Sequence, residues 1–310
     1  MKTIFGPINS RRFGSSLGID LSPSLKQCNF DCLYCELSPS ATTDKQKNVL
    51  EVSTVINELK EHLNDKIDVI TITANGEPTL YPYLDELIDE LNKIKNNTQT
   101  LILTNSSNLI DEKIFNSLLK LDQVKLSLDA VSNSVFKRID RPHTDIDIEK
   151  IVKKVIEFSH VYKGKLFIEI LFVKDLNDTQ DEIKKLNEVL KQIKSTRIDI
   201  GTIDRPPAYP VSGVTYKELH EISHLFDSSL PIHIASRTHA RPSSNHYDNE
   251  EIINTLDKRP LTSEDIDLLF DEDSKKRFAV LLQESKIAKK KVGNLEFFIP
   301  HENENRKRAK

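Results

Sequence analysis

The chain has 310 residues, which is long enough for one large domain and a smaller one with a substantial buried core. Hydrophobic residues make up 37% and charged residues 30%, the balance of a globular protein, and no apolar run reaches the length of a membrane span. A net charge of -4 excludes a protein that coats nucleic acid over its whole surface, but allows a local basic patch. Gly6, Pro7 and Asn9 interrupt the first apolar residues, so we expect no secretory signal and a cytoplasmic location.

From residue 16 the chain alternates short apolar runs with amphipathic patterns of helical period. Strands are predicted at residues 16–23, 69–74, 100–105, 124–130, 165–173 and 197–203. Helices are predicted at residues 52–63, 83–94, 111–119, 146–162, 179–193 and 215–226. This order predicts an α/β fold with a parallel sheet, either doubly wound or closed into a partial TIM-like (β/α)6 barrel. In both architectures the functional groups lie at the carboxyl ends of the strands.

The pattern changes near residue 245, where a polar stretch precedes shorter elements. Helical patterns occupy residues 250–256, 263–270 and 274–285. Two strand-like runs then flank Gly293-Asn294, a dipeptide suited to a hairpin turn. Three helices and a hairpin predict a winged-helix-like domain. We therefore expect a core domain over 1–245, this accessory domain over 246–300 and a basic, disordered tail over 301–310.

All three cysteines, Cys28, Cys32 and Cys35, lie in one short segment after the first parallel strand. An odd number confined to one loop does not fit a disulfide scaffold. Thiolates spaced C-x3-C-x2-C can bind three irons of a cubane and leave the fourth iron open for chemistry. The alternative is a structural zinc completed by a histidine. Zinc sites more often use paired C-x2-C or H-x3-H elements, and the sequence has no such second half.

The cysteine segment CNFDCLYC, with Tyr34 before the last cysteine, resembles the signature of the radical S-adenosylmethionine (radical SAM) superfamily. The resemblance implies a partial barrel with a [4Fe-4S] cluster whose open iron is chelated by S-adenosylmethionine (SAM). It implies that one electron cleaves SAM and that the resulting 5′-deoxyadenosyl radical abstracts hydrogen from a substrate. It also implies a reductant such as flavodoxin or ferredoxin.

Further stretches resemble superfamily motifs at the ends of later strands. Asn75-Gly76-Glu77-Pro78 resembles the GGEP motif that receives the methionyl amine, with Asn75 replacing the first glycine. Asn105, and Ser127 with Asp129, resemble positions that meet the ribose and the methionyl carboxylate. Taken alone, the glycine motif is equally a strand-end turn, and Asn105, Ser127 and Asp129 are better explained as strand-end caps. With the cysteines, the resemblance implies cofactor contacts at Tyr34, Gly76, Glu77, Pro78, Asn105, Ser127 and Asp129. Separately, Glu169 is interpreted as a barrel carboxylate that needs a partner.

Within the superfamily, PINSRRFGSSLGIDL and SLDAVSNSVFKRIDRPH resemble the group related to wyosine-base synthases, which act on a guanosine of tRNA. Cationic residues near strand ends and in loops suit phosphate or carboxylate groups. They are Arg11, Arg12, Arg138, Arg141, His143, Arg205, Arg237, His239 and Arg241. Arg141 and His143 are the candidate catalytic residues, although His143 is equally explained as polar loop surface. The predicted partner is a tRNA or another phosphate-bearing substrate.

A nucleic-acid-binding regulator is the competing hypothesis. It would hold a redox-sensing cluster on the three cysteines and bind nucleic acid through the winged helix. A basic edge formed by Lys289, Lys290, Lys291, Arg306, Lys307 and Arg308 suits phosphate contacts or simple solvation. The regulator hypothesis predicts that no 5′-deoxyadenosine forms under reducing conditions, whereas the enzyme hypothesis predicts that it forms.

Overall fold

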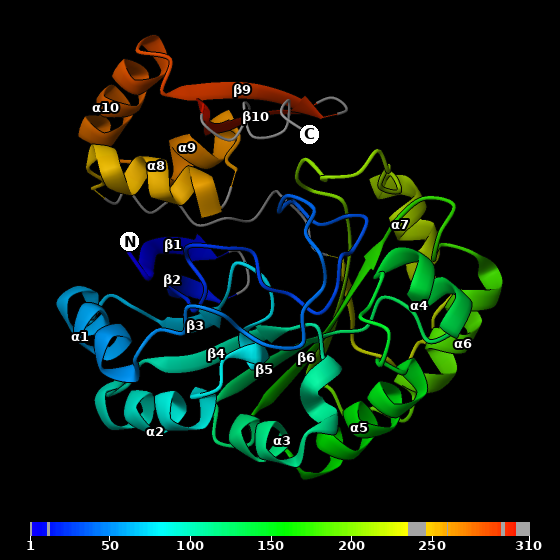
Figure 1. Ribbon diagram of the computed structural model, residues 1–310. Helices are drawn as coiled ribbons and strands as arrows, with labels where there is room; N and C mark the ends of the chain where they lie inside the picture. The colour runs from blue at the N-terminus through cyan, green and yellow to red at the C-terminus, as the bar shows by residue number, and fades with distance from the viewer. Residues whose placement is uncertain (1, 11–12, 235–245, 259, 293–294, 302–310) are drawn as a thin grey trace.

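The computed structural model describes residues 2–10, 13–234, 246–258, 260–292 and 295–301, and its centre is a curved eight-stranded sheet (Figure 1). The strands are β1 (Ile4–Ser10), β2 (Gly14–Asp20), β3 (Val69–Thr73), β4 (Gln99–Thr104), β5 (Gln123–Ser127), β6 (Lys165–Phe172), β7 (Arg197–Thr202) and β8 (Ile232–Ile234). Their order in the sheet follows their order in the chain. The strands from β2 to β8 pair in parallel, which confirms the predicted parallel sheet and partial barrel.

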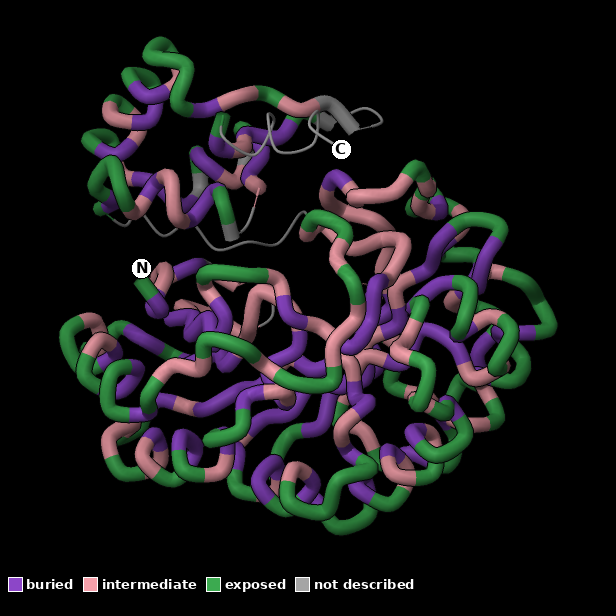
Figure 2. Tube along the Cα trace, in the orientation of Figure 1, coloured by how far each residue is buried: buried purple, intermediate pink, exposed green. Residues whose placement is uncertain are grey.

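Helices cover the outer face of this sheet (Figure 1). They are α1 (Val52–His62), α2 (Leu84–Ile94), α3 (Glu112–Leu118), α4 (Asn133–Ile139), α5 (Ile148–Val161), α6 (Gln180–Leu190) and α7 (Tyr216–Ser223), with short 3-10 turns η1 (Pro78–Leu80) and η2 (Ser107–Ile110). Alternate strand residues such as Ile70 and Ile72 pack against helix residues such as Leu59 and Leu87, all fully buried. Figure 2 shows this buried layer along the strands and the inner sides of the helices.

The face of the sheet that the helices leave uncovered carries a row of polar residues. The parallel register aligns Ser127 with Glu169, Glu169 with Asp199, and Asp199 with His233. Because strand side chains alternate between faces, these residues project away from the apolar layer. Glu169 forms an ion pair with the buried Lys125, which supplies the partner expected for this carboxylate. The Nδ1 atom of His233 lies 3.1 Å from Oδ1 of Asp199.

The sheet has more strands than the six that were predicted. β1, predicted only as an entry segment, pairs antiparallel with β2, and the short β8 extends the parallel series beyond β7. Gly6-Pro7 inside β1 weakens the sequence signal of a strand, but a proline is tolerated in an edge strand. Helix α4 was not among the predicted helices, although it has the same length as α3.

The C-terminal part contains α8 (Asn249–Lys258), α9 (Ser263–Leu269), α10 (Glu272–Gln283) and an antiparallel pair, β9 (Ile287–Val292) with β10 (Leu295–Pro300). It has its own hydrophobic cluster, which includes Tyr247, Phe270 and Phe298 and also takes in Ile8 of β1. The Tyr247 hydroxyl donates a hydrogen bond to the carbonyl oxygen of Pro7. The C-terminal part therefore packs on the edge strand (Figure 1).

Some predicted features lie outside the described residues: the Gly293-Asn294 turn and nearly all of the basic tail. Within the described ranges, no helix is long and apolar enough to cross a membrane.

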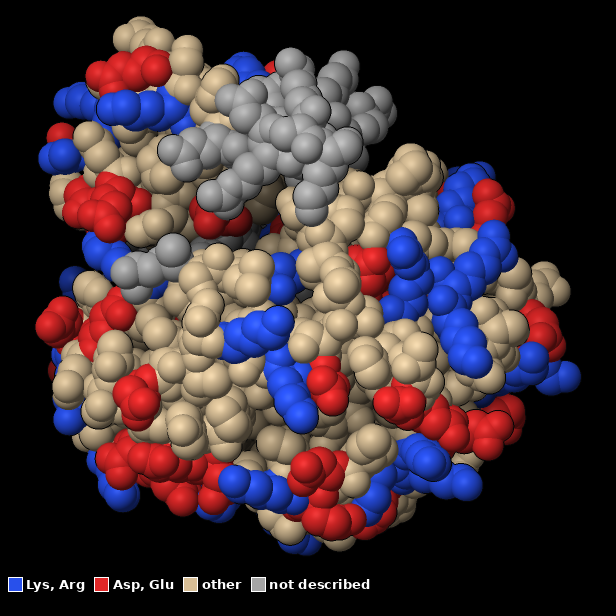
Figure 3. Space-filling model, in the orientation of Figure 1, with Lys and Arg blue, Asp and Glu red and all other residues tan. Residues whose placement is uncertain are grey.

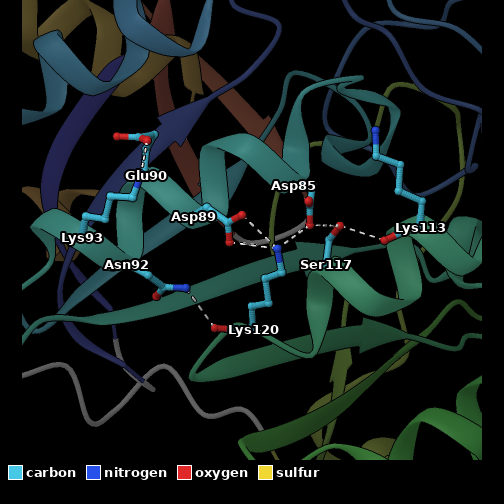
Figure 4. Close-up of polar contacts among 8 residues, drawn as sticks. All are labelled: Asp85, Asp89, Glu90, Asn92, Lys93, Lys113, Ser117 and Lys120. Atoms are coloured by element: carbon cyan, nitrogen blue, oxygen red, sulfur yellow. Dashed lines mark hydrogen bonds and ion pairs between the residues drawn. The ribbon is translucent and has the colours of Figure 1, made fainter.

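On the outer surface, ion pairs join α2 to the end of α3 (Figure 4). The Lys120 ammonium lies 2.8 Å from Oδ1 of Asp85 and 2.8 Å from Oδ1 of Asp89. The Ser117 hydroxyl donates to Asp85 at 2.7 Å. The hydrogen bonds from Lys120 and Ser117 favour the charged carboxylate and hold the pKa of Asp85 below its usual range.

We expect Lys120→Met to lower the free energy of unfolding at pH 7 by about 0.2–1 kcal/mol, because the pairs it breaks are partly exposed. The depressed pKa of Asp85 means that its contribution is present above the ordinary value of 3.8 and is lost as the pH falls through the lowered value. The difference between wild type and variant should therefore shrink in acid. Urea unfolding from pH 2 to pH 7 measures this.

Leu87→Ala on the buried face of α2 is the reference variant, with an expected loss of about 2–5 kcal/mol that does not depend on pH. A Lys120→Met effect as large as that of Leu87→Ala, or one that grows in acid, would contradict this account.

Candidate functional site

The three cysteines lie on a long segment, the cluster loop (residues 21–50), which connects β2 to α1 at the carboxyl end of the sheet. One side of this loop pairs with the residues that follow β3. The amide of Gln27 donates to the carbonyl oxygen of Asn75 at 2.8 Å, and the amide of Glu77 donates to the carbonyl oxygen of Gln27 at 2.9 Å. The loop is thereby joined to the sheet by backbone hydrogen bonds immediately before the first cysteine.

Gly76 makes this pairing possible. Its φ is +137°, and a Cβ added at this position would lie 1.8 Å from the carbonyl oxygen of Gln27. No side chain fits there without moving the loop. The glycine predicted from the motif is therefore required by a close approach of two backbone segments.

The end of α4 holds the other side of the cluster loop. The amide of Leu33 donates to the carbonyl oxygen of Ile139 at 2.8 Å, and the amide of His143 donates to the carbonyl oxygen of Asn29 at 2.8 Å. The helix that was missed in the sequence thus fixes the position of the cysteines.

Cys28, Cys32 and Cys35 are free and partly exposed. Burial of the sulfurs, with the charge of Glu77, raises the pKa of Cys28 to about 12, and burial also raises the pKa of Cys32 and Cys35. The amide of Phe30 donates to the Cys28 sulfur at 3.4 Å. Three thiols with a backbone donor suit iron, and its positive charge would offset the cost of forming thiolates in this setting.

Within the part of the chain that the structure describes, no group of three or more His, Cys, Asp or Glu side chains is placed to hold a metal ion. The thiols of a cubane site each bind a different iron, so they need not converge on one point.

Glu77 is a buried carboxylate that ties the ends of β3 and β4 together. Its Oε1 accepts hydrogen bonds from the Thr79 amide (2.9 Å), the Thr79 hydroxyl (2.6 Å) and the Thr104 hydroxyl (2.6 Å), and its Oε2 accepts from the Asn105 amide (2.8 Å). Burial raises its pKa, and these hydrogen bonds act in the opposite direction. The Glu77 side chain is thus directed to the protein frame, and its backbone is engaged as well, with the amide donating to Gln27 and the carbonyl oxygen accepting from the Leu80 amide at 3.2 Å.

Asn105 reaches from the end of β4 to the cluster loop. Its Nδ2 donates to Oδ1 of Asn29 at 2.8 Å and lies 3.9 Å from the Cys28 sulfur. Asn29 in turn donates to the Ser107 hydroxyl at 2.7 Å. Asn29 was not predicted as a site residue. Its position directly after the first cysteine is the signal that could have identified it.

Tyr34 in the cluster loop contacts Asp129, which follows β5. The Tyr34 hydroxyl donates to Oδ2 of Asp129 at 2.5 Å, and the Leu171 amide donates to Oδ1 at 2.7 Å. Burial raises the pKa of Asp129 to about 7, against the effect of these hydrogen bonds. A cavity of about 10 Å³, which has room for about one water molecule, is lined here by four predicted cofactor residues, Tyr34, Asn105, Ser127 and Asp129, together with Phe30 and Asp140.

Arg141 and His143 point to different partners. Arg141, at φ +46°, stacks over the Tyr209 ring at 4.6 Å and lies 3.3 Å from Oδ2 of Asp31. With Asp31 and Tyr209 it lines a cavity of about 500 Å³ beside the cluster loop. Nδ1 of His143 lies 3.8 Å from Asp145. Only Arg141 of the two candidates therefore lines this cavity.

The segment after β7 also contacts the loop. The Ala208 amide donates to the carbonyl oxygen of Cys35 at 2.8 Å, and Arg205 pairs with Glu36 at 2.5 Å. Arg138 is exposed on α4. The other predicted cationic residues, Arg11, Arg12, Arg237, His239 and Arg241, lie outside the described residues.

We expect Gly76→Ala to lower the free energy of unfolding by at least about 1–3 kcal/mol, because the new methyl group and the required φ are both incompatible with the loop contact. Gly201→Ala is the matched control, since an added Cβ there meets nothing within 4 Å, and its effect should stay within about 0.5 kcal/mol. Urea unfolding compares the two variants. Equal effects would show that the Gln27 contact does not constrain position 76.

Sequence comparisons find relatives over nearly the whole chain. The family model of the radical SAM superfamily matches residues 23–190. A UPF0026 protein of Helicobacter pylori strain J99 is 40% identical over 299 residues, which cover 95% of this chain and 96% of that protein. A UPF0026 protein of Methanocaldococcus jannaschii is 33% identical over 67% of this chain and 65% of its own length.

Solved structures share the fold. TYW1 with a lysine-pyruvate adduct bound matches with a TM-score of 0.53 at 20% identity, over 73% of this chain and 76% of that one. Streptococcus suis SuiB bound to S-adenosylmethionine matches with a TM-score of 0.54 at 19% identity, over 74% of this chain and 54% of that one. Together with the family match, which spans more than half of the residues, they show that the chain belongs to the radical SAM superfamily and is an enzyme that uses a [4Fe-4S] cluster and SAM.

Proposed function

We propose that Cys28, Cys32 and Cys35 each bind one iron of the cluster and that the enzyme abstracts a hydrogen atom from a nucleic-acid substrate. The observation that carries the first part is the placement of three free thiols on one loop at the carboxyl end of the sheet, with Nδ2 of Asn105 3.9 Å from the Cys28 sulfur. When bound there, the cluster and SAM supply reductive cleavage to a 5′-deoxyadenosyl radical, with the electron drawn from a reductant of the flavodoxin or ferredoxin kind.

Several residues around the cluster loop suit the binding of SAM. Gly76, Glu77 and Pro78 follow β3 beside the cluster loop, where Gly76 lets the two backbone segments approach closely. Asn105, Ser127 and Asp129 lie together at the ends of β4 and β5. Asp129 is held in one orientation by the Tyr34 hydroxyl and the Leu171 amide. We assign these residues to hold the ribose and methionyl groups.

Changing any one of the three cysteines to alanine should abolish SAM cleavage while the fold is retained, because Cys28 and Cys32 only pack against the margin of the apolar core and Cys35 is not part of it. The measurement is 5′-deoxyadenosine formation, followed by chromatography after anaerobic reconstitution with iron and sulfide and reduction with dithionite. Circular dichroism checks the fold.

Full cleavage activity in a single-cysteine variant would refute the ligand assignment. The regulator hypothesis predicts instead no cleavage by the wild type and nucleic-acid binding that changes with cluster oxidation.

We propose a tRNA as the substrate. The segments that resemble the wyosine-base group support this, as does the fold likeness to TYW1. Helix α4 carries exposed Lys137 and Arg138 next to the Arg141 cavity, and Figure 3 shows Lys and Arg side chains gathered over this region. The stacked pair of Arg141 and Tyr209 offers planar groups to a base. Arg141 is thus proposed to contact the substrate, and the role of His143 as a general acid remains a prediction.

We further propose that residues 246–300 form a winged-helix-like accessory domain. Its order of helices and hairpin fits, and an isolated bridge joins Leu261, between α8 and α9, to Phe298 of β10. On α10, Lys275 lies 3.1 Å from Glu272 and Arg277 lies 2.9 Å from Asp273. These pairs reduce the positive charge offered by α10, so the surface of α4 is the better candidate for the contact with tRNA.

The double variant Lys137→Met/Arg138→Met should bind tRNA more weakly and reduce the slope of log K against log salt by about 2, because two phosphate contacts are lost. The control, Lys163→Met/Lys165→Met, removes two exposed lysines at the opposite end of the barrel. Fluorescence anisotropy with labelled tRNA at several salt concentrations measures both. Equal salt slopes for the two double variants would argue against α4 as the contact surface.

A further inference from the structure

Two N–H groups from different parts of the chain face the sulfur of Cys28. The Phe30 amide, two residues further along the cluster loop, lies 3.4 Å from the sulfur. The side-chain nitrogen Nδ2 of Asn105, directly after β4, lies 3.9 Å from it. Both contacts are N–H···S hydrogen bonds, and they become stronger when the sulfur is a thiolate because hydrogen bonds to a charged acceptor are the stronger ones.

The side chain of Asn105 is held with its nitrogen, and not its oxygen, toward the cluster loop. Its Oδ1 accepts hydrogen bonds from the Ser107 hydroxyl at 2.6 Å and from the Ser107 backbone amide at 3.1 Å. A backbone amide can only donate, so the atom of Asn105 beside it must be the oxygen. The nitrogen therefore lies on the side of Cys28.

Asn29 fixes the same arrangement from the cluster loop. Its Oδ1 accepts a hydrogen bond from Nδ2 of Asn105 at 2.8 Å, and its own Nδ2 donates to the Ser107 hydroxyl at 2.7 Å. Asn29 is 2% exposed and Ser107 is 1% exposed, so water hardly competes for these hydrogen bonds. An amide nitrogen carries two hydrogens, so Asn105 can donate to Asn29 and to the Cys28 sulfur at the same time.

We propose that Asn105 is a positioning residue that sets the reduction potential of the cluster through its hydrogen bond to the Cys28 sulfur, with Ser107 and Asn29 holding the amide in place. The assignment rests on the proposed function, because it requires Cys28 to bind the cluster. An electron added to the cluster increases the negative charge on the cysteine sulfurs, and an N–H group directed at a sulfur stabilises that charge. Asn105 therefore raises the reduction potential and makes the cluster easier to reduce.

The test removes the donor and is made without SAM, which separates this role of Asn105 from its proposed contact with SAM. Asn105→Leu and Asn105→Ala remove the amide, and Ser107→Ala removes the hydroxyl that orients it. Asn108→Leu is the matched control. Asn108 lies in the same turn, with its Oδ1 3.5 Å from Nδ2 of Asn29, and within the described residues it makes no hydrogen bond to a cysteine sulfur.

Each full-length protein is reconstituted anaerobically with iron and sulfide, and its iron and sulfide contents are measured. The cluster is then titrated with dithionite at controlled potentials while electron paramagnetic resonance follows the reduced form. We expect both Asn105 variants to lower the equilibrium constant for reduction by about threefold, which is about 28 mV for one electron. Ser107→Ala should cause a smaller shift in the same direction, and Asn108→Leu should retain the wild-type potential.

A fully loaded cluster with wild-type potential in both Asn105 variants would overturn the assignment. An equal shift in Asn108→Leu would also overturn it, because loosening the turn would then be sufficient. If neither Asn105 variant binds a full cluster while Asn108→Leu does, the assignment is likewise wrong, because the amide is then needed to assemble the site. Failure of the wild type itself to bind a cluster would instead overturn the proposed function on which the assignment rests.

Discussion

The backbone pairing of Gln27 with the residues around Gly76 is the contact on which the candidate site depends. It joins a loop of irregular structure to the end of a buried parallel strand, immediately before the first cysteine. The rigid sheet thereby sets the position of the thiols. Glu77 continues the connection to β4 through Thr104 and the Asn105 amide. From there the Asn105 side chain returns to Asn29 in the loop, so that the loop and two strand ends form a closed network.

Charge is distributed unevenly within this network. Carboxylates such as Asp129 and Glu77 are buried and stabilised mainly by hydrogen-bond donors of the protein, and burial raises the pKa of both. The thiols lie in the same low-dielectric surroundings, where forming a thiolate is unfavourable. Within this arrangement Lys26 is a buried cation without a hydrogen-bond partner among the described residues. Metal ions and thiolates are most stable in such a site when they are present together, because the charge of each offsets the electrostatic cost of burying the other.

Local patterns allowed the prediction of the parallel strands, their helices and the cysteine motif, because apolar runs and short spacings are visible in a single sequence. Pairings between distant segments were not visible. The ion pair of Lys125 with Glu169 depends on the register between β5 and β6, and the contact of Tyr34 with Asp129 depends on how the loop folds back. Arg141 and His143 are two residues apart, yet their side chains have different partners, Tyr209 with Asp31 and Asp145 respectively, which residue type does not reveal.

The packing of the first strand affects the order in which parts of the chain can fold during synthesis. β1 contributes Ile8 to a hydrophobic cluster whose other members, from Tyr247 onward, are synthesised last. While the chain emerges from the ribosome, β2 and the parallel series can assemble, but Ile8 lacks these cluster partners until about 240 further residues have been added, which is the separation between Pro7 and Tyr247. The amino-terminal strand is therefore the part of the sheet most dependent on completion of translation, and a prematurely ended chain would expose it to other strands.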